Sequence, residues 1–339
     1  MKAKPVYPRQ VAAFLAAAIL VVCLVDGSAH LAIADSSSAI KQTAAQNLDN
    51  RSDVQAKGGL RGAPLAPAIT PTAAEPSSTA SRARVYLFRG ALGPIFSRGM
   101  DHLTEKIQRA GVRANVYEFT ICSLIASAAI KDYREDPAPI ILIGHSMGGS
   151  CALLFAEKLQ NEGFPVSLVV TIDPARMSPD VPLNVEHFIN IFLSKDVLGG
   201  GDIKPKQGFR GSYASYDLAQ HDEVSHITID KMDAIHQQLI AKIVRLTAAP
   251  AKVEGEVIPL RYVVPAGEEI ELWDSGMAVT ARSRDTLQTL ALRYRLPQWS
   301  LTQINQMPDN APLTAGERII VPRYLTPLTT VSEPVSSRP

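Results

Sequence analysis

The chain has 339 residues, enough for about two domains of ordinary size. Its 34 Lys and Arg residues nearly balance its 33 Asp and Glu residues, and the formal net charge is +1. Such a balance leaves no excess of positive charge for binding a phosphate backbone, so no nucleic-acid partner is expected.

Residues 1–34 have the pattern of a secretory signal peptide. Basic residues precede an apolar run, residues 11–25, and an Ala-x-Ala site ends the segment. This pattern predicts cleavage before Asp35 and export of the mature chain. An uncleaved membrane anchor is the alternative, but it would place Asp26 and His30 in hydrocarbon. A membrane is therefore expected to be met only through this segment.

Two segments have compositions that do not favour folding. Residues 35–82 are rich in Ala, Ser, Thr, Pro and Gly and hold few large apolar side chains. They cannot bury enough surface to offset their chain entropy, so we expect a disordered spacer. The tail, residues 324–339, is polar and rich in proline, and it is expected to be disordered for the same reason.

Residues 83–247 alternate short apolar runs with stretches of helical periodicity. This alternation predicts βαβ units, and hence an α/β fold with a mostly parallel sheet flanked by helices. The expected strands lie at 85–88, 112–119, 140–143, 166–172, 187–193 and, more weakly, 212–217. The expected helices lie at 97–110, 121–133, 149–160 and 231–245, with Asp230 as the N-cap of the last one.

The most informative segment is the pentapeptide Gly144-His145-Ser146-Met147-Gly148. It lies between an apolar run that reads as a buried strand and a stretch with helical composition. A strand-to-helix turn this tight accepts only small residues at 144 and 148, and it pushes the serine hydroxyl out above the sheet. The pattern predicts that Ser146 is a nucleophile; the alternative is a glycine turn that merely contains a serine.

A serine hydroxyl is a weak nucleophile at neutral pH and needs an adjacent base. In this architecture an acid and then a histidine follow the serine along the chain. His226 is the best candidate base, because it falls in a loop after the last predicted strand, at the carboxyl edge of the sheet. His221 is its one serious competitor. His102 and His236 fall in predicted helices and are expected to be solvated surface residues.

Asp173 and Asp196 each follow a predicted strand, so either could orient the imidazole and stabilise its charged form. Asp173 is favoured because it ends the stronger apolar run. The oxyanion formed in acyl transfer needs preorganised donors. We expect them to be the N–H groups of Met147, next to the nucleophile, and of Ala91, in the loop after the first strand. Leu92 is the alternative to Ala91.

Taken together, residues 84–246 resemble the α/β-hydrolase superfamily, in particular its small esterase and lipase-like members. The resemblance rests on the pentapeptide 144–148, on Arg89-Gly90-Ala91, on Asp173 and on the turn Val224-Ser225-His226. It implies hydrolysis of a carboxylic ester through an acyl-serine intermediate, with no metal and no organic cofactor. The segment lacks the first strands and any large lid insertion of that superfamily, which implies a small or open acyl pocket.

Residues 248–276 are expected to be a linker with extended segments, followed by a βααβ unit at 277–323. Its helices are expected at 287–294 and 298–306, and its last strand at 318–321. This unit resembles a LysM domain, and the resemblance rests on Asp285-Thr286-Leu287, Tyr294, Asn305 and the segment 313–322.

The LysM resemblance implies binding of peptidoglycan or another glycan that contains N-acetylglucosamine. It implies contacts from Asp285, Thr286 and Leu287 and from the loop 309–312. Arg284 and Arg295 stand where the family usually has glycine, which frees φ in a way that arginine does not.

Of the three cysteines, Cys23 lies within the predicted signal segment. Cys122 and Cys151 each have an apolar helical context, and they are expected to be separate buried thiols. A disulfide between them is the alternative in an exported protein.

These patterns together predict an exported serine hydrolase, periplasmic or associated with the cell wall, that a glycan-binding module holds near the wall. Two other hypotheses stay open. The first is a non-catalytic peptidoglycan-binding protein in which the hydrolase fold is only a scaffold. The second is an esterase directed at the wall itself, which removes O-acetyl groups from the glycan.

Overall fold

The computed structural model describes residues 81–248 and 255–326. The predicted signal segment, residues 35–80 of the predicted spacer and residues 327–339 of the predicted tail lie outside the described residues. The spacer prediction is wrong for residues 81–82, which belong to the first strand, and the tail prediction is wrong for Tyr324, which ends the last strand. Within the described ranges, no helix combines the length and the apolar character needed to cross a membrane.

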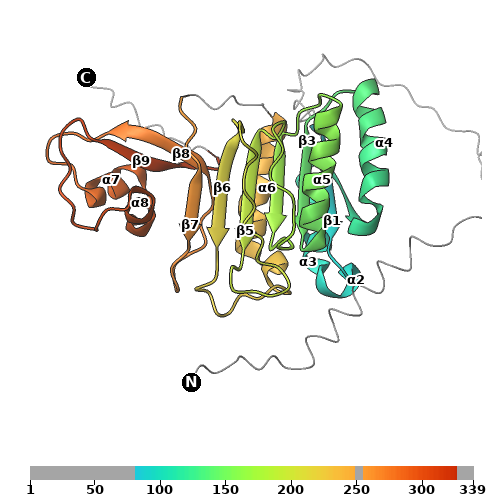
Figure 1. The fold of residues 1–339 in the computed structure, drawn as a ribbon, viewed down its shortest axis with the longest axis horizontal. Coiled ribbons are helices and arrows are strands. Elements are labelled where there is room, and N and C mark those ends of the chain that lie inside the picture. Colours follow the sequence, from blue (N-terminus) through green and yellow to red (C-terminus); the bar gives the residue numbers. More distant parts are fainter. Residues whose placement is uncertain (1–80, 249–254, 327–339) are drawn as a thin grey trace, which may run out of the picture. The chain divides into compact units, whose positions relative to one another are not determined.

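A seven-stranded sheet forms the centre of the fold (Figure 1), and all its neighbouring strands run parallel. The strand order is β2-β1-β3-β4-β5-β6-β7. The strands are β1 (Ser81–Arg89), β2 (Val112–Glu118), β3 (Ile140–His145), β4 (Leu168–Ile172), β5 (His187–Phe192), β6 (Ser212–Asp217) and β7 (Leu260–Val263). The chain starts at β1, moves outward to β2 and returns to β3. The order therefore reverses between β1 and β3, where ligands of open parallel sheets bind outside the carboxyl ends.

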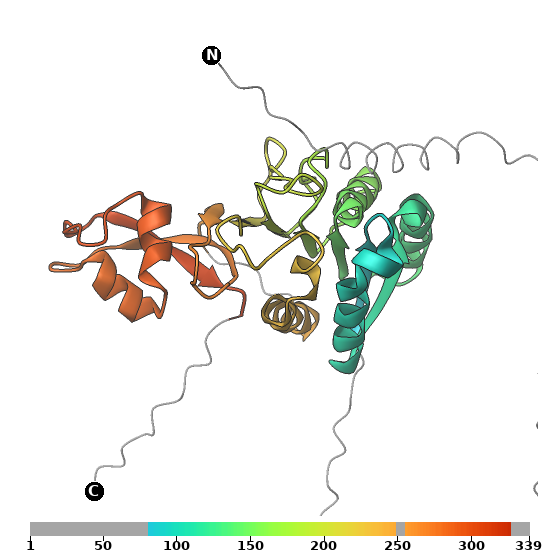
Figure 2. The same ribbon diagram turned by 90° about the horizontal axis from the view of Figure 1, so that it is seen from below.

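Helices cover both faces of this sheet, as the α/β fold class requires (Figures 1 and 2). One face carries α3 (Arg98–Arg109) and α6 (Asp233–Ala248), and the other carries α4 (Cys122–Glu135) and α5 (Met147–Asn161). Side chains along a strand alternate between the faces. Val85 and Leu87 of β1 accordingly lie in the core under α3 and α6, while Tyr86 and Phe88 lie under α4 and α5.

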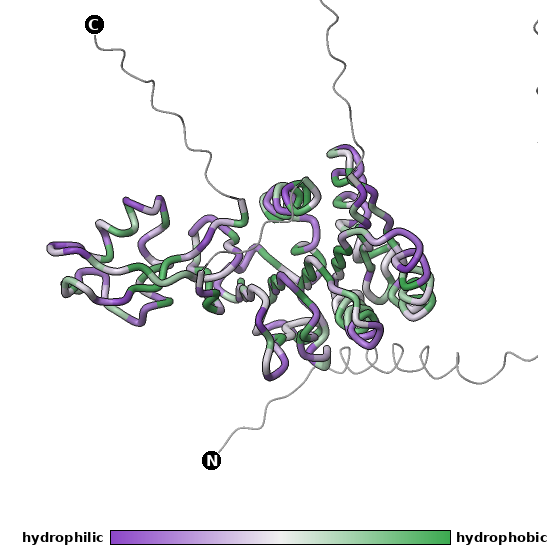
Figure 3. The backbone as a smooth tube through the Cα atoms, turned by 90° about the horizontal axis from the view of Figure 1, so that it is seen from above, coloured by the Kyte–Doolittle hydropathy of each residue, from purple (hydrophilic) through white to green (hydrophobic). Residues whose placement is uncertain are grey.

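The middle strands are mostly apolar because both faces are covered, and Figure 3 shows hydrophobic stretches of backbone between the helices. All six residues of β3 are buried, as are all five of β4 and all six of β5. This explains why β3 to β5 were predictable as short, mostly apolar runs, whereas β6, with the sequence Ser-Tyr-Ala-Ser-Tyr-Asp, gave a weaker signal.

Three expectations about the helices are wrong. Cys122 and Cys151 form a disulfide, with their Cα atoms 5.8 Å apart, because the start of α4 packs beside α5. The last helix begins at Asp233, and Asp230 is not its N-cap: the buried Asp230 carboxylate accepts a hydrogen bond from the N–H of Gly99 at 2.9 Å. His236 is 1% exposed rather than solvated, since α6 turns it toward the core.

The C-terminal unit has the predicted βααβ order. It comprises β8 (Trp273–Thr280), α7 (Leu287–Tyr294), α8 (Gln298–Asn305) and β9 (Arg318–Tyr324), and β8 pairs antiparallel with β9. Thr286 caps α7 through a capping box with Thr289. Arg284 and Arg295 both have positive φ, 69° and 54°, a conformation that glycine adopts more easily than a residue with a side chain.

The segment 248–276 contributes to both units. Its strand β7 is the edge strand of the large sheet, where Ala214 of β6 pairs with Leu260. Tyr262 of β7 packs edge-on against Trp273 of β8 and Trp299 of α8, with ring centroids 5.1 and 5.5 Å away. An aromatic cluster therefore joins β7 of the large sheet to β8 and α8 of the C-terminal unit.

Candidate active site

The turn between β3 and α5 has the geometry of a nucleophile elbow. Ser146 connects the two elements with φ 56° and ψ −124°, a strained conformation for a residue with a side chain. A Cβ on Gly144 would lie 2.0 Å from the carbonyl oxygen of Gly148, and one on Gly148 would lie 2.2 Å from that of Phe88. The prediction that only small residues fit at both positions is confirmed, and the space admits no side chain larger than that of glycine.

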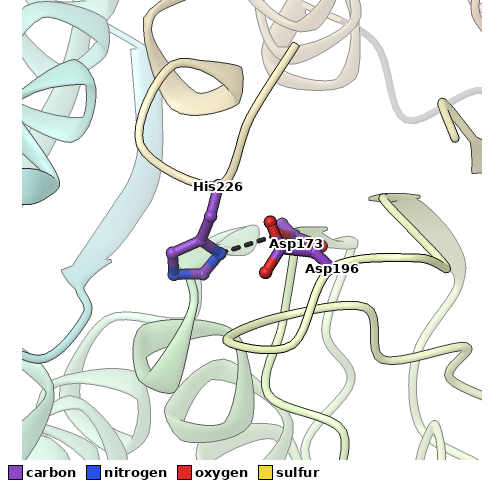
Figure 4. A group of neighbouring side chains, drawn as sticks. All are labelled: Asp173, Asp196 and His226. Atoms are coloured by element: carbon purple, nitrogen blue, oxygen red, sulfur yellow. Dashed lines mark hydrogen bonds and ion pairs between the residues drawn. The ribbon is translucent and has the colours of Figure 1, made fainter. Parts of the chain in front are cut away.

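His226 lies beside Asp173 at the same edge of the sheet (Figure 4). Its Nδ1 is 2.6 Å from Asp173 Oδ2, and both side chains are buried. The other carboxylate oxygen, Oδ1, accepts hydrogen bonds from the N–H groups of Leu193 at 3.0 Å and Gly200 at 2.8 Å. These contacts fix the carboxylate. Because Nδ1 faces Asp173, the second ring nitrogen, Nε2, is left for another group.

The serine backbone is tied to the strand that carries the acid. The N–H of Ser146 donates to the carbonyl of Ile172 at 3.0 Å, one residue before Asp173. Asp173 itself has a positive φ of 41°, so both Ser146 and Asp173 depart from regular backbone where their strands end. Among the described residues, Ser146 Oγ makes no hydrogen bond with His226, as is common for catalytic pairs without substrate.

Asp196 is the third member of the group in Figure 4. One ligand atom from each of Asp173, Asp196 and His226 lies within 4.8 Å of the others, and within the described ranges no other such group of His, Cys, Asp or Glu atoms could hold a metal ion. Asp196 does not bond to the imidazole; its Oδ1 accepts from the N–H of Leu198 at 2.8 Å. Of the two acids predicted, Asp173 is thus the one in contact with His226.

The other histidines do not meet Asp173. His221 Nδ1 lies 2.9 Å from Glu223 Oε1, and its Nε2 is buried without a partner. His236 Nε2 donates to the carbonyl of Asp230 at 2.7 Å, and burial lowers the pKa of this histidine to about 4. His102 is exposed on α3.

The backbone N–H groups closest to Ser146 along the fold come from the start of α5 and from the loop after β1. Met147 is the first residue of α5, so its N–H has no partner within the helix. A Cβ on Gly90 would lie 2.6 Å from Ser146 Cβ, which shows how closely the loop after β1 approaches the serine. Gly90 donates its own N–H to Ser97 Oγ at 3.1 Å. No hydrogen bond within the described residues uses the N–H of Ala91 or of Leu92.

His145 has a connecting role that the sequence did not suggest. Its Nε2 lies 2.8 Å from the carbonyl of His226, which can only accept, so Nε2 carries the proton. Its Nδ1 then accepts from the hydroxyl of Ser97 at 2.8 Å, and Ser97 Oγ accepts from Gly90. Burial, with a smaller effect from His226, lowers the pKa of His145 to about 3 and keeps the ring neutral. One directed chain thus links the loop after β1 to the loop that carries His226.

The predicted glycan-binding residues lie at the start of α7. Thr286 bridges to Pro312, so the segment 285–287 and the loop 309–312 lie side by side. Asp285 pairs with Arg293, whose hydrogen bond lowers the pKa of that carboxyl. Leu287 is fully buried, so its side chain packs in the core and is not open to a ligand.

Comparison with known protein families assigns the C-terminal unit. Residues 279–322 match the family model of the LysM domain, and the βααβ unit is therefore a LysM domain. No curated protein matches the chain.

Two solved structures resemble parts of the chain. One is a protein of Xanthomonas campestris pv. campestris assigned to the alpha/beta superfamily of hydrolases; it is 16% identical, covers 49% of this chain and 98% of its own, and has a TM-score of 0.31. The other belongs to work on LipS and LipT, two metagenome-derived lipolytic enzymes; it is 20% identical, covers 31% of this chain and 51% of its own, and has a TM-score of 0.21.

Proposed function

We propose that this protein is an exported serine hydrolase that cleaves carboxylic esters and that its LysM domain holds it at peptidoglycan. The observation that carries the proposal is the meeting of two features at one edge of the sheet. Ser146 occupies a strained turn at the start of a helix. The His226–Asp173 pair lies at the end of the neighbouring strand, with one imidazole nitrogen unused by the acid.

In the proposed mechanism, His226 Nε2 takes the hydroxyl proton while Ser146 Oγ attacks the ester carbonyl. The N–H groups of Met147 and Ala91 receive the oxyanion, and each such donor contributes about 3 kcal/mol to the transition state. Asp173 holds the imidazole through Nδ1 and stabilises its charged form. His226 then protonates the leaving alcohol, and water activated by the same histidine releases the acid from Ser146.

The LysM domain supplies location rather than chemistry. The contact between Thr286 and Pro312 joins the two segments that the family resemblance assigns to sugar binding. Because Leu287 is buried, we assign sugar contacts in this region to Thr286 and to backbone groups. A glycan-bound module keeps the hydrolase near the wall, which raises its effective concentration there.

Labelling with a fluorophosphonate probe tests the proposed nucleophile. The wild-type protein should react, and Ser146→Ala should not. Ser150→Ala is the matched control, because Ser150 lies one turn into the same helix and bonds to Ser178 rather than facing the site. It should label like the wild type. A folded wild type that does not label would favour a wall-binding protein with a silent hydrolase fold.

Sedimentation with purified peptidoglycan tests the LysM part separately. Asn310→Trp would crowd the exposed loop 309–312 and should reduce binding, whereas Leu292→Trp changes an exposed residue near the far end of α7 and should not. Equal binding by both variants would show that the glycan site does not include this loop.

A further inference from the structure

Exposed apolar side chains concentrate at the edge of the sheet that carries Ser146. Fifteen large hydrophobic residues of the described ranges are exposed, and ten of them lie in the loops and first helical turns that follow the carboxyl ends of β1 to β6. Figure 2 looks onto this edge of the sheet. Scattered exposed hydrophobics need no explanation, but a concentration around one site marks a surface that binds something apolar.

The strongest part of this surface follows β1. Residues 91–96, Ala-Leu-Gly-Pro-Ile-Phe, hold no charged residue and end in the short helix α2 (Gly93–Phe96), and all of them except Gly93 are exposed. Leu92 is 63% exposed and Ile95 is 64% exposed. This segment continues directly from Gly90, where a Cβ would lie 2.6 Å from Ser146 Cβ, so it borders the nucleophile.

A second uncharged segment lies next to it, after β2. Residues 119–130 contain no charged residue, and Ile121 and Leu124 are 40% and 67% exposed. The two segments are neighbours, since a Cβ on Gly93 would lie 2.8 Å from a carboxylate oxygen of Glu118. The Cys122–Cys151 disulfide ties this segment to α5, the helix that Ser146 precedes.

We call the exposed apolar side chains of these two neighbouring segments the apolar platform and define it as Leu92, Ile95, Phe96, Ile121 and Leu124. Arg89, which ends β1, forms ion pairs with both Asp101 and Glu118. The Lys158 ammonium is held by Ser123 and Ser127 of the second segment. Across the site, the loops after β4, β5 and β6 add Met177, Val197, Leu198 and Ile227, all exposed.

We propose, on the basis of the ester hydrolysis proposed above, that the platform receives the acyl chain of a long-chain, water-insoluble ester. An ester carbonyl placed between Ser146 Oγ and the N–H of Ala91 would lie next to the segment 91–96. We therefore place the acyl chain attached to that carbonyl on the platform. Covering exposed apolar side chains with an acyl chain is favourable in proportion to the area removed from water. An acetyl group is too short to cover them. The substrate class is therefore a lipid-like ester and not an O-acetylated glycan.

The test compares p-nitrophenyl esters of acetic, butyric, octanoic and dodecanoic acid. For the wild type, kcat/KM should rise by at least tenfold from the two-carbon to the twelve-carbon ester. Ile95→Ser and Leu124→Ser, both at exposed positions where the fold tolerates serine, should together lower kcat/KM for the twelve-carbon ester at least tenfold and change the two-carbon value less than twofold. The matched control is Leu154→Ser on α5, which is 52% exposed and outside the platform, and it should leave both values unchanged.

The outcomes separate this inference from the proposed function. If fluorophosphonate labels Ser146 but the wild type prefers acetyl esters or deacetylates isolated cell wall, the platform proposal is overturned and the hydrolase stands. Equal losses on short and long esters in the double variant would also overturn it. If Ser146 does not label and no ester is cleaved, the proposed function fails and the platform proposal fails with it.

Discussion

Two buried pairs of histidine and aspartate lie at opposite edges of the sheet, each with a serine nearby. At the carboxyl edge, His226 meets Asp173 at 2.6 Å, close to the elbow of Ser146. At the amino edge, His187, the first residue of β5, meets Asp274 of β8 at 2.8 Å and Ser212 of β6 at 2.6 Å. The residue types are the same, so composition does not distinguish the two sites.

Geometry does distinguish them. At the amino edge, Ser212 and Asp274 both face Nδ1 of His187, so the serine and the carboxylate compete for one nitrogen. Lys242 forms a buried ion pair with Asp274 at 2.8 Å, so the lysine charge offsets the negative charge of the carboxylate. At the carboxyl edge the acid uses Nδ1 alone, which leaves Nε2 for a serine, and unpaired N–H groups stand beside that serine. A catalytic triad needs its acid on one imidazole nitrogen and its serine at the other. Of the two edges, the carboxyl edge alone has that order.

The largest expected effect separates the two serines. Ser146→Ala should lower kcat for ester hydrolysis by about 10⁴- to 10⁶-fold, because removing the nucleophile removes the acyl-enzyme route. Ser212→Ala should change kcat less than twofold. Steady-state kinetics on one soluble ester compares both variants. A large loss in Ser212→Ala and none in Ser146→Ala would reverse the assignment of the two edges.

The next effect concerns the acid. Asp173→Asn should lower kcat by about 10³- to 10⁴-fold, because an amide cannot hold the imidazole in the right tautomer or stabilise its charge. Asp196→Asn should cost less than tenfold, since Asp196 does not bond to His226 although it lies within 4.8 Å of it. If Asp196→Asn proves the more damaging change, Asp196 is the working acid and the resting contact of Asp173 is structural.

At the amino edge, the expected effect is on stability. Asp274→Ala leaves the buried Lys242 ammonium without its carboxylate, although His187 Nδ1 stays 3.4 Å away, and should lower the free energy of unfolding by about 3–5 kcal/mol. Urea unfolding measures the loss, and the kcat of the folded variant at 25 °C should match the wild type. A variant with normal stability and lost activity would show that this edge takes part in catalysis.

The contacts of Asp274 with Lys242 and His187 should also make the free energy of unfolding depend on pH in the acid range. Burial alone would raise the pKa of Asp274, but the hydrogen bond from His187 and the charge of Lys242 lower it below its usual value. The folded state therefore binds this proton less readily than the unfolded state. The contribution is fully present above the unfolded pKa of about 4 and is lost as the pH falls below it. The stability difference between wild type and Asp274→Ala should shrink on acidification.

Much of the carboxyl edge could be predicted from sequence because its signals are local. The elbow pentapeptide, the apolar run of β3 and the aspartate that ends β4 are each readable within about ten residues. His226 could be predicted as the base from the order of the residues along the chain and from the position of its loop. The hydrogen-bond chain through Ser97 and His145 could not be predicted, because its hydrogen bonds join residues that are 48 and 81 positions apart in the sequence.

The amino edge escaped prediction for a related reason. His187 and Asp274 are 87 positions apart, and their contact depends on β8 packing against the large sheet. The short strand β7 was hidden in a segment that looked like a linker, since a four-residue edge strand carries little periodicity. The disulfide depended on the distance between two helices, which no local pattern reports.

The hydrogen-bond chain through Ser97 and His145 belongs to the carboxyl edge, and breaking it should give a smaller effect. Ser97→Ala removes the donor to His145 and the acceptor of Gly90, so the loop that carries Ala91 is less well fixed. A loss of about 1–2 kcal/mol in transition-state stabilisation is expected, which is about 5- to 30-fold in kcat. KM for a short ester should change little. Ser150→Ala, which also removes a serine hydroxyl near the elbow, is the control and should retain full kcat.

The smallest effect concerns backbone strain. Ser146 and Asp173 hold positive φ at the proposed site, whereas His187 and Asp274 do not. Arg284 of the LysM domain also has positive φ, 69°, but it is exposed and belongs to no proposed catalytic group. Left-handed backbone costs a side-chain-bearing residue about 1–2 kcal/mol, and glycine recovers this at an entropic cost of about 0.5–1 kcal/mol.

Arg284→Gly should therefore stabilise the protein by about 0.5 kcal/mol, seen as a small rise in Tm, without changing ester hydrolysis or peptidoglycan binding. The reverse change, Gly316→Ala at φ 92°, should lower stability by about 1 kcal/mol. If Arg284→Gly instead weakens peptidoglycan binding, the strain at this turn has a binding role, as the strain at Ser146 is proposed to have a catalytic one.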